Sequence, residues 1–161
     1  MPVSKSDVER LMPRMAGWIG HKARNVSLGI GSYLTMDFGR AIEVLISNKH
    51  KLTRGEWHLW VQYCAWRIEA RGKVVAGSDD PRDKLEHAVK YFEGLALESV
   101  NVIPPAPDVI FVFEKDVVLR LFPFNFTGNY EDWYLYTPDG YVLVLGGKKS
   151  WDYVSANASP T

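Results

Sequence analysis

Two side chains that could form a nucleophilic dyad, His58 and Cys64, lie six residues apart in a segment of strand-forming residues. A histidine activates a thiol only within hydrogen-bond distance. In an extended strand, six residues at about 3.3 Å each separate the two groups by roughly 20 Å. The spacing therefore argues against a dyad within one strand. Cys64 is the only cysteine of the chain, and we expect it to be a small buried hydrophobe.

The four histidines do not have the spacing of a metal site. His21, His50, His58 and His87 match neither H-x-H nor H-E-x-x-H, so a zinc site would have to assemble from scattered elements. We expect His50 and His87 to be solvated and His58 to be a half-buried strand residue. No catalytic residue, metal ligand or cofactor is predicted.

The carboxylates and glycines are explained by structure rather than by chemistry. Asp79 and Asp80 precede a proline, which is the pattern of a helix start. Glu56 and Asp132 each precede a tryptophan, where an acid could anchor an arginine or a loop amide. The glycine-containing segments match neither G-x-x-x-x-G-K-[ST] nor a G-x-G-x-x-G that opens a helix, so phosphate cradling is not predicted.

The aromatic content is the main indication of a binding function. Aromatic residues make up 13% of the chain and six of them are tryptophans, which is more than a core of this size requires. Trp and Tyr dominate the contact energy of protein interfaces and also line small-ligand pockets. These rings therefore have three alternative roles: a protein-binding patch, a small-ligand pocket, or packing within the sheet itself.

Two helices should position these residues. The segment Ser6-Asp7-Val8-Glu9 has the pattern of a capping box and predicts a helix over 6–16, kinked or shortened by Pro13. A second helix follows Asp79-Asp80-Pro81 and ends at Gly94. Its buried face has apolar residues at spacings of three and four: Leu85, Ala88, Val89 and Phe92.

The remaining chain reads as short antiparallel strands between Gly, Asn, Asp and Pro breaks. A hairpin is predicted around Pro138-Asp139-Gly140, and a second around Glu114-Lys115-Asp116. The segment 56–70 is apolar on both faces, which favours one central strand bent near Gln62. The predicted strands cover 25–30, 32–38, 41–47, 56–70, 73–77, 97–103, 109–114, 117–122, 131–136 and 141–146. We therefore predict an α+β fold, with antiparallel sheet and two helices in a single domain over 1–161.

The chain also contains a repeated pattern, since Glu56-Trp57-His58-Leu59-Trp60 is followed 76 positions later by the similar Asp132-Trp133-Tyr134-Leu135-Tyr136. This offset predicts an internal duplication of a helix followed by four or five strands. The repeat units would cover 4–78 and 79–154, and 155–161 would form a flexible tail. Equivalent strands would then bury Trp57, Leu59, Trp133 and Leu135.

Composition excludes several classes of function. The net charge is zero, which argues against the basic surface of a nucleic-acid-binding protein. Apolar runs are too interrupted by charge for a membrane span. The first residues lead into a polar helix without the apolar stretch of a signal peptide, so we expect a cytoplasmic protein.

Three sequence segments resemble a family of small bacterial proteins without assigned activity. They are Gly31-Ser32-x-Leu34-x-Met36-x-Phe38-Gly39, then Gly55-Glu56-Trp57-x-Leu59-Trp60-x3-Cys64-x-Trp66-Arg67, then Gly77-Ser78. Members of such families are similar in size and organisation to the immunity proteins of bacterial toxin systems. The resemblance implies a compact cytoplasmic domain that works by binding, and it brings no site residues.

The sequence thus favours a non-enzymatic protein-binding protein, with a toxin-neutralising immunity protein as the sharpest hypothesis. The alternative is a small-ligand-binding protein or divergent enzyme with an aromatic pocket. A protein partner, the toxin, is expected, with no nucleic acid and no membrane, and the chain is expected to be a monomer or homodimer. Two loops displayed by the sheet are the predicted contact sites. Their candidate residues are Lys49, His50, Lys51 and Arg54 in the basic loop 48–54, and Tyr130, Glu131 and Asp132 in the acidic aromatic loop 129–132.

Overall fold

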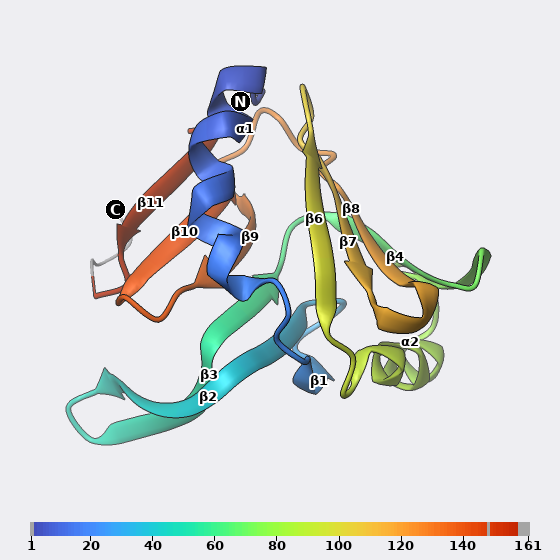
Figure 1. The fold of residues 1–161 in the computed structure, drawn as a ribbon, viewed down its shortest axis with the longest axis horizontal. Coiled ribbons are helices and arrows are strands. Elements are labelled where there is room, and N and C mark those ends of the chain that lie inside the picture. Colours follow the sequence, from blue (N-terminus) through green and yellow to red (C-terminus); the bar gives the residue numbers. More distant parts are fainter. Residues whose placement is uncertain (1, 148, 158–161) are drawn as a thin grey trace.

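The computed structural model describes residues 2–147 and 149–157, and it consists of two antiparallel sheets with two short α-helices (Figure 1). The α+β class and the antiparallel sheets are confirmed. The six-stranded sheet has the order β1-β2-β3-β9-β10-β11, and the five-stranded sheet has the order β5-β4-β8-β7-β6. The strands are β1 Arg24–Leu28, β2 Leu34–Ser47, β3 His50–Val61, β4 Ala65–Ala70, β5 Lys73–Gly77, β6 Leu97–Ile103, β7 Asp108–Phe113, β8 Val117–Phe122, β9 Glu131–Tyr136, β10 Tyr141–Gly146 and β11 Trp151–Ser155.

The capping residue of the first helix lies two positions earlier than the sequence predicts, at Ser4 instead of Ser6. The helix α1 (Lys5–Leu11) is capped by Ser4, whose hydroxyl accepts from the Asp7 amide while the Asp7 carboxylate accepts from the Ser4 amide. Asp7 therefore completes the capping box, the role that the sequence pattern assigned to Glu9. Pro13 ends the α-helix as predicted, and the chain continues as the 3₁₀-helix η1 (Met12–Trp18).

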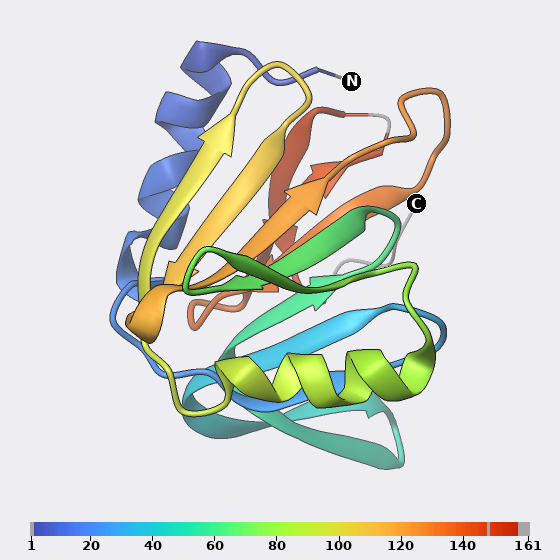
Figure 2. The same ribbon diagram turned by 90° about the vertical axis from the view of Figure 1, so that its right-hand side faces the viewer.

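The second helix, α2 (Arg82–Ala88), continues as the 3₁₀-helix η2 (Val89–Phe92). The Asp80 carboxylate accepts from the Gly77 amide and does not cap the helix. Figure 2 shows α2 running beside the two edge strands β5 and β1. Arg82 fixes it there by donating to the carbonyl oxygens of Gly29 and Gly31, 2.6 and 2.9 Å away. The helix α2 therefore closes one side between the two sheets.

The predicted strands at 32–38 and 41–47 are one strand, β2, interrupted by a bulge in its pairing with β3 between Phe38 and Ala41. At the bulge, a Cβ on Gly55 would lie 2.7 Å from the backbone nitrogen and oxygen of Phe38. Only glycine allows this approach. Beyond the bulge, β2 and β3 continue as a two-stranded ribbon that leaves the body of the molecule, at the lower left of Figure 1.

The prediction of one central strand over 56–70 is wrong. The chain leaves the six-stranded sheet after Val61 and enters the five-stranded sheet at Ala65. Segment 62–64 makes the crossing, and the Gln62 amide donates to the Asp132 carbonyl on the way. Both faces read as apolar because the inner face fills the core while the outer face carries half-buried aromatic rings.

The first half of the chain places β1–β3 in the six-stranded sheet and β4–β5 in the five-stranded one; the second half places β6–β8 in the five-stranded sheet and β9–β11 in the six-stranded one. The two halves are thus interlocked. The duplication is not confirmed at the 76-residue offset, because Trp57 lies on β3, the third strand of its half, and Trp133 lies on β9, the fourth strand of the other.

The core lies between the inner faces of the sheets, where Phe38 and Phe113 stack with ring centroids 6.3 Å apart and Phe111 meets Trp133 at 5.7 Å. The largest fully buried side chains include Trp18, Trp66, Trp133, Phe38, Phe92, Phe111 and Phe113. The predicted core residues Trp57, Leu59, Trp133 and Leu135 are all buried.

The hairpins at 114–116 and 138–140 are confirmed, whereas β11 was not predicted. Of the expected tail 155–161, Ser155 ends β11 and residues 158–161 lie outside the described residues. Over the described ranges, neither α-helix has the length and apolar character needed to cross a bilayer.

Candidate functional site

The predicted basic loop 48–54 is mostly strand. We call residues 40–55 the β2–β3 ribbon. Only Asn48 and Lys49 form its turn, because Ser47 already pairs with His50 across the two strands. The ribbon contains four Lys or Arg side chains and one Glu, a net charge of +3. Figure 1 shows it projecting away from both sheets, so its two faces are open over most of its length.

Three aliphatic side chains of the ribbon are exposed to solvent. Leu45 is 70% exposed, Ile46 64% and Leu52 46%. Leu52 pairs with Val44 and Leu45 with Lys51, so Leu45 and Leu52 lie on opposite faces of the ribbon. Single exposed apolar residues are common, but three on one short projection indicate an interaction surface that includes both faces of its tip. The charges of this segment were predicted from the sequence and its apolar tip was not, although Leu45-Ile46 stands close to the two-residue turn Asn48-Lys49.

The four predicted basic residues differ in accessibility. Lys49, His50 and Lys51 are exposed, and Lys51 forms a loose ion pair with Glu43 at 3.8 Å. Arg54 is half-buried at the root of the ribbon. Its guanidinium lies over the ring of Tyr136, 4.8 Å from the centroid, and donates to the Gly55 carbonyl at 2.8 Å. Burial lowers the pKa of Arg54, but a guanidinium remains charged at any physiological pH.

The acidic aromatic loop 129–132 is not an exposed acidic patch. Tyr130 is 55% exposed and its ring lies 4.6 Å from that of Tyr63. The Glu131 carboxylate is half-buried and accepts from the Tyr134 hydroxyl at 3.0 Å. Asp132 is only 4% exposed. Of the three predicted residues, only Tyr130 can contact a partner with most of its side chain.

Asp132 is an unusual group, because its carboxylate is buried without a hydrogen-bond donor among the described residues. One oxygen occupies the space above Gly146, where a Cβ would collide with it, and Gly146 has a φ of +92°. Burial is the main cause that raises the pKa of Asp132 to about 7, and the neighbouring charge of Glu131 adds to it.

The outer face of the six-stranded sheet joins the two predicted sites. His58 faces Tyr136 across β3 and β9, and Trp60 faces Tyr134 in the next row, with ring centroids 5.9 and 5.8 Å apart. The root of the ribbon and Tyr130 lie at opposite ends of β9. A strip of half-buried aromatic rings therefore runs between them.

A hydrogen-bonded Asp–His pair lies within this face and was missed by the sequence analysis. His58 Nδ1 is 2.6 Å from Asp37 Oδ1, and the Asn25 side chain donates to Asp37 Oδ2 at 3.1 Å. Burial alone would raise the pKa of Asp37, but hydrogen bonds from His58, the Gly55 backbone and Asn25 together lower it. Finding this pair needs the register of β2 on β3, which residue types do not provide.

Such a pair could orient a general base, but acyl-transfer chemistry also needs a nucleophile within reach. Cys64 is 3% exposed, and burial raises the pKa of its thiol, so it is an inert packing residue. Its Sγ contacts the Asp132 carbonyl at 3.7 Å. The described ranges contain no cluster of three potential metal ligands.

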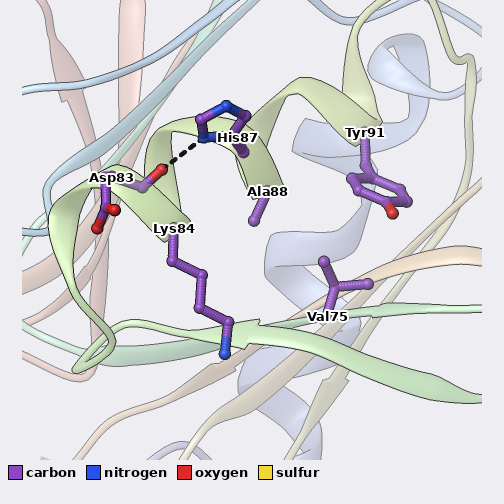
Figure 3. Close-up of a pocket in the computed structure, with 6 residues that line it drawn as sticks. All are labelled: Val75, Asp83, Lys84, His87, Ala88 and Tyr91. Atoms are coloured by element: carbon purple, nitrogen blue, oxygen red, sulfur yellow. Dashed lines mark hydrogen bonds between the residues drawn. The ribbon is translucent and has the colours of Figure 1, made fainter.

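A hollow of about 440 Å³ lies between α2 and β5, away from the aromatic face (Figure 3). Two of its polar groups are engaged: His87 Nδ1 bonds the Asp83 backbone carbonyl at 2.7 Å, and Lys84 pairs with Asp80 at 3.1 Å. His87 is exposed, as the sequence predicts, and one of its ring nitrogens bonds its own helix. The apolar wall of this hollow is formed by Val75, Ala88 and Tyr91.

Comparison of the chain with protein-family models, with curated proteins and with solved structures finds no match.

Proposed function

We propose that the protein is a non-enzymatic protein-binding protein, and that it docks its partner on the β2–β3 ribbon and the adjoining outer face. The observation that carries this proposal is the exposure of Leu45, Ile46 and Leu52 on a projecting basic ribbon. Exposed aliphatic tips cost solubility without stabilising the fold, and burial against a partner removes that cost. The resemblance to immunity proteins makes a bacterial toxin the partner that we propose.

The charge of the ribbon favours an acidic partner surface. Lys49 and Lys51 flank the apolar tip, Arg54 lies at the root of the ribbon, and Glu43 is the acidic residue of the ribbon. Complementary charge mainly speeds association and sets register, while the burial of the aliphatic groups supplies affinity. A nuclease toxin bound through its basic surface, which an exposed acidic loop would suit, is disfavoured by the burial of Asp132.

The test is binding of an identified partner, measured with purified proteins. The partner is captured from a lysate of the native host, identified by mass spectrometry and purified. Replacing Leu45 and Ile46 by Ser removes about 1.4 kcal/mol of burial for each side chain, so the Kd should rise about 100-fold. Reversing charge with Lys49→Glu and Lys51→Glu should lower the association rate and flatten its dependence on salt.

A matched control reverses two exposed lysines outside the ribbon, Lys5→Glu on α1 and Lys73→Glu on β5 of the other sheet. It changes net charge equally and should leave the Kd within about twofold, because distant exposed charges are screened. The immunity role adds a growth assay, in which the partner expressed alone inhibits growth and coexpression with the wild-type chain restores it. A partner that binds both ribbon variants as tightly as the wild type would disprove the ribbon as docking site, and growth unaffected by the partner would disprove the immunity role.

A small-ligand-binding protein or divergent enzyme is the second candidate, and the Asp37–His58 pair with Arg54 and Tyr136 is the observation that favours it. This arrangement places an oriented imidazole and a guanidinium on one half-buried surface. Saturable stabilisation by a small molecule that is lost in His58→Gln and unchanged in the ribbon variants would favour this candidate.

We also propose that the chain arose by internal duplication with β1–β5 equivalent to β6–β10. Under this correspondence the order β1-β2-β3-β9-β10 matches β6-β7-β8-β4-β5, so each unit gives three strands to one sheet and two to the other. Trp66 on β4 then matches Trp133 on β9, where they pair with Leu121 on β8 and Val61 on β3. Superposition of the two units on these strands checks it.

A further inference from the structure

A second hollow, of about 740 Å³, continues from the one in Figure 3 along β5 and shares Val75 and Tyr91 with it. We call the two together the β5 groove. The floor of the second hollow is apolar and belongs to the core, with Leu95 and Val117 only 7% and 5% exposed. Tyr91, half exposed, forms part of its wall.

Three basic side chains surround this floor: Arg71, Lys73 and Lys115. Within the part of the chain that the structure describes, none of them forms an ion pair. Glu93 also lines the hollow, but its two carboxylate oxygens accept from the backbone amides of Asn25 and Val26. The hollow therefore holds three unpaired positive charges beside an apolar floor.

Two of these basic residues occupy backbone positions that suit glycine or asparagine. Arg71 has a φ of 53° in the two-residue turn 71–72, and Lys115 has a φ of 60° in the three-residue turn 114–116; the residue after each also has positive φ. Such positions favour glycine or asparagine, and a long side chain there carries a conformational cost. The two turns touch, since the Arg71 amide donates to the Asp116 carbonyl at 3.1 Å.

Strained positions that carry charge and converge on one hollow indicate a role beyond folding, because either turn would form more readily with glycine. Three positive charges beside the one carboxylate of Glu93 leave the hollow with a net charge of +2, which favours an anion. We propose that the β5 groove binds a small organic anion, a carboxylate or a phosphate ester, whose apolar part lies on Leu95, Val117 and Tyr91. This site is independent of the ribbon and of the protein-binding function.

The experiment measures binding of hexanoate and of phenyl phosphate to the full chain by calorimetry, with amide chemical shifts locating the site. Inorganic phosphate and hexyltrimethylammonium are the comparison probes. One of the two anions should bind saturably and shift the Val75, Leu95 and Val117 amides, and the two anions together distinguish carboxylate from phosphate recognition. The cation should not bind.

The decisive variant is Lys115→Gly, which removes one charge and keeps the positive φ of the turn. It should keep or raise the thermal midpoint, since glycine relieves the strained backbone, while anion affinity falls about tenfold or more. Lys49→Gly on the ribbon removes the same charge in another turn and should leave anion binding unchanged. Failure of both anions to bind at millimolar concentration, unchanged binding in Lys115→Gly, or equal binding of inorganic phosphate and phenyl phosphate would each overturn the proposal.

Discussion

Replacing Asp132 by Asn should make the protein more stable at alkaline pH and leave it almost unchanged at acid pH. Asn has the shape of the protonated acid and cannot ionise. The carboxyl of Asp132 is buried beside Gly146, with no hydrogen-bond donor among residues 2–147 and 149–157, and its pKa is raised from 3.8 to about 7. Ionisation is therefore disfavoured in the folded protein and unhindered in the unfolded chain.

The direction of the pH effect follows from linkage. Below pH 3.8 both states hold the proton, so Asp132 does not affect stability. Between pH 3.8 and about 7 the unfolded chain has lost the proton and the folded protein has kept it, so stability falls as pH rises. Above about pH 7 the folded protein ionises too, and the loss stays constant.

The magnitude is set by the size of the shift. A change of roughly three pKa units, at about 1.36 kcal/mol each, gives a ceiling of about 4 kcal/mol. Relaxation around the ionised carboxylate reduces it, so we expect Asp132→Asn to be about 2 to 4 kcal/mol more stable than the wild type at pH 8.5, relative to pH 4.

Urea unfolding followed by tryptophan fluorescence at pH 4, 6 and 8.5 provides the free energies of unfolding. Taking the difference between variant and wild type cancels the titration of histidines and surface acids. Asp139→Asn is the matched control, because hydrogen bonds from Thr137 and Tyr153 hold the pKa of Asp139 below its usual value. For Asp139→Asn, the difference in unfolding free energy from the wild type should be the same at pH 6 and at pH 8.5. A difference for Asp132→Asn that is equal at all three pH values would refute the assigned cause.

Two further substitutions test the core and the bulge by the same unfolding measurement. Truncating Trp57 to Ala should cost about 3 to 5 kcal/mol, since the ring is 7% exposed and leaves a cavity between the sheets; an unmoved urea midpoint would contradict its burial. Replacing Gly55 by Ala should cost about 1 to 3 kcal/mol, because the new Cβ would lie 2.7 Å from the Phe38 backbone. Gly29→Ala, whose Cβ would meet Tyr33 at 3.6 Å, should stay within about 0.5 kcal/mol; equal losses at both glycines would show that close approach is not the cause.

Local signals in the sequence predicted local structure well. The turn Pro138-Asp139-Gly140 lies between two alternating apolar runs, and the hairpin β9–β10 forms there because everything that determines it is close in sequence. The spacing of Leu85, Ala88 and Phe92 located α2 and η2 for the same reason.

The errors come from features that depend on distant parts of the chain. Segment 56–70 looks like one strand, and only the presence of a second sheet explains why it divides after Val61. The Asp37–His58 pair depends on a register between strands, and the burial of Asp132 depends on a bulge opposite Gly146. Residue types alone described Asp132 as part of an exposed acidic loop, since a charged residue is rarely buried without a partner.

The places where the sequence disagrees with the needs of folding are informative about function. The interlocked core requires neither the aliphatic tip of the ribbon nor long basic side chains at Arg71 and Lys115. A serine at the tip and a glycine in each turn would preserve the same sheets at lower cost, and sequences commonly break local rules where a site demands it. Asp132 differs from these, because it is only 4% exposed and offers almost no surface to a partner. The loss of folding stability at Asp132 can affect binding only through β9, the strand that places Tyr134 and Tyr136 on the outer face. The exposed residues of the ribbon and of the β5 groove would contact a ligand directly, so their variants can be tested without disturbing the core.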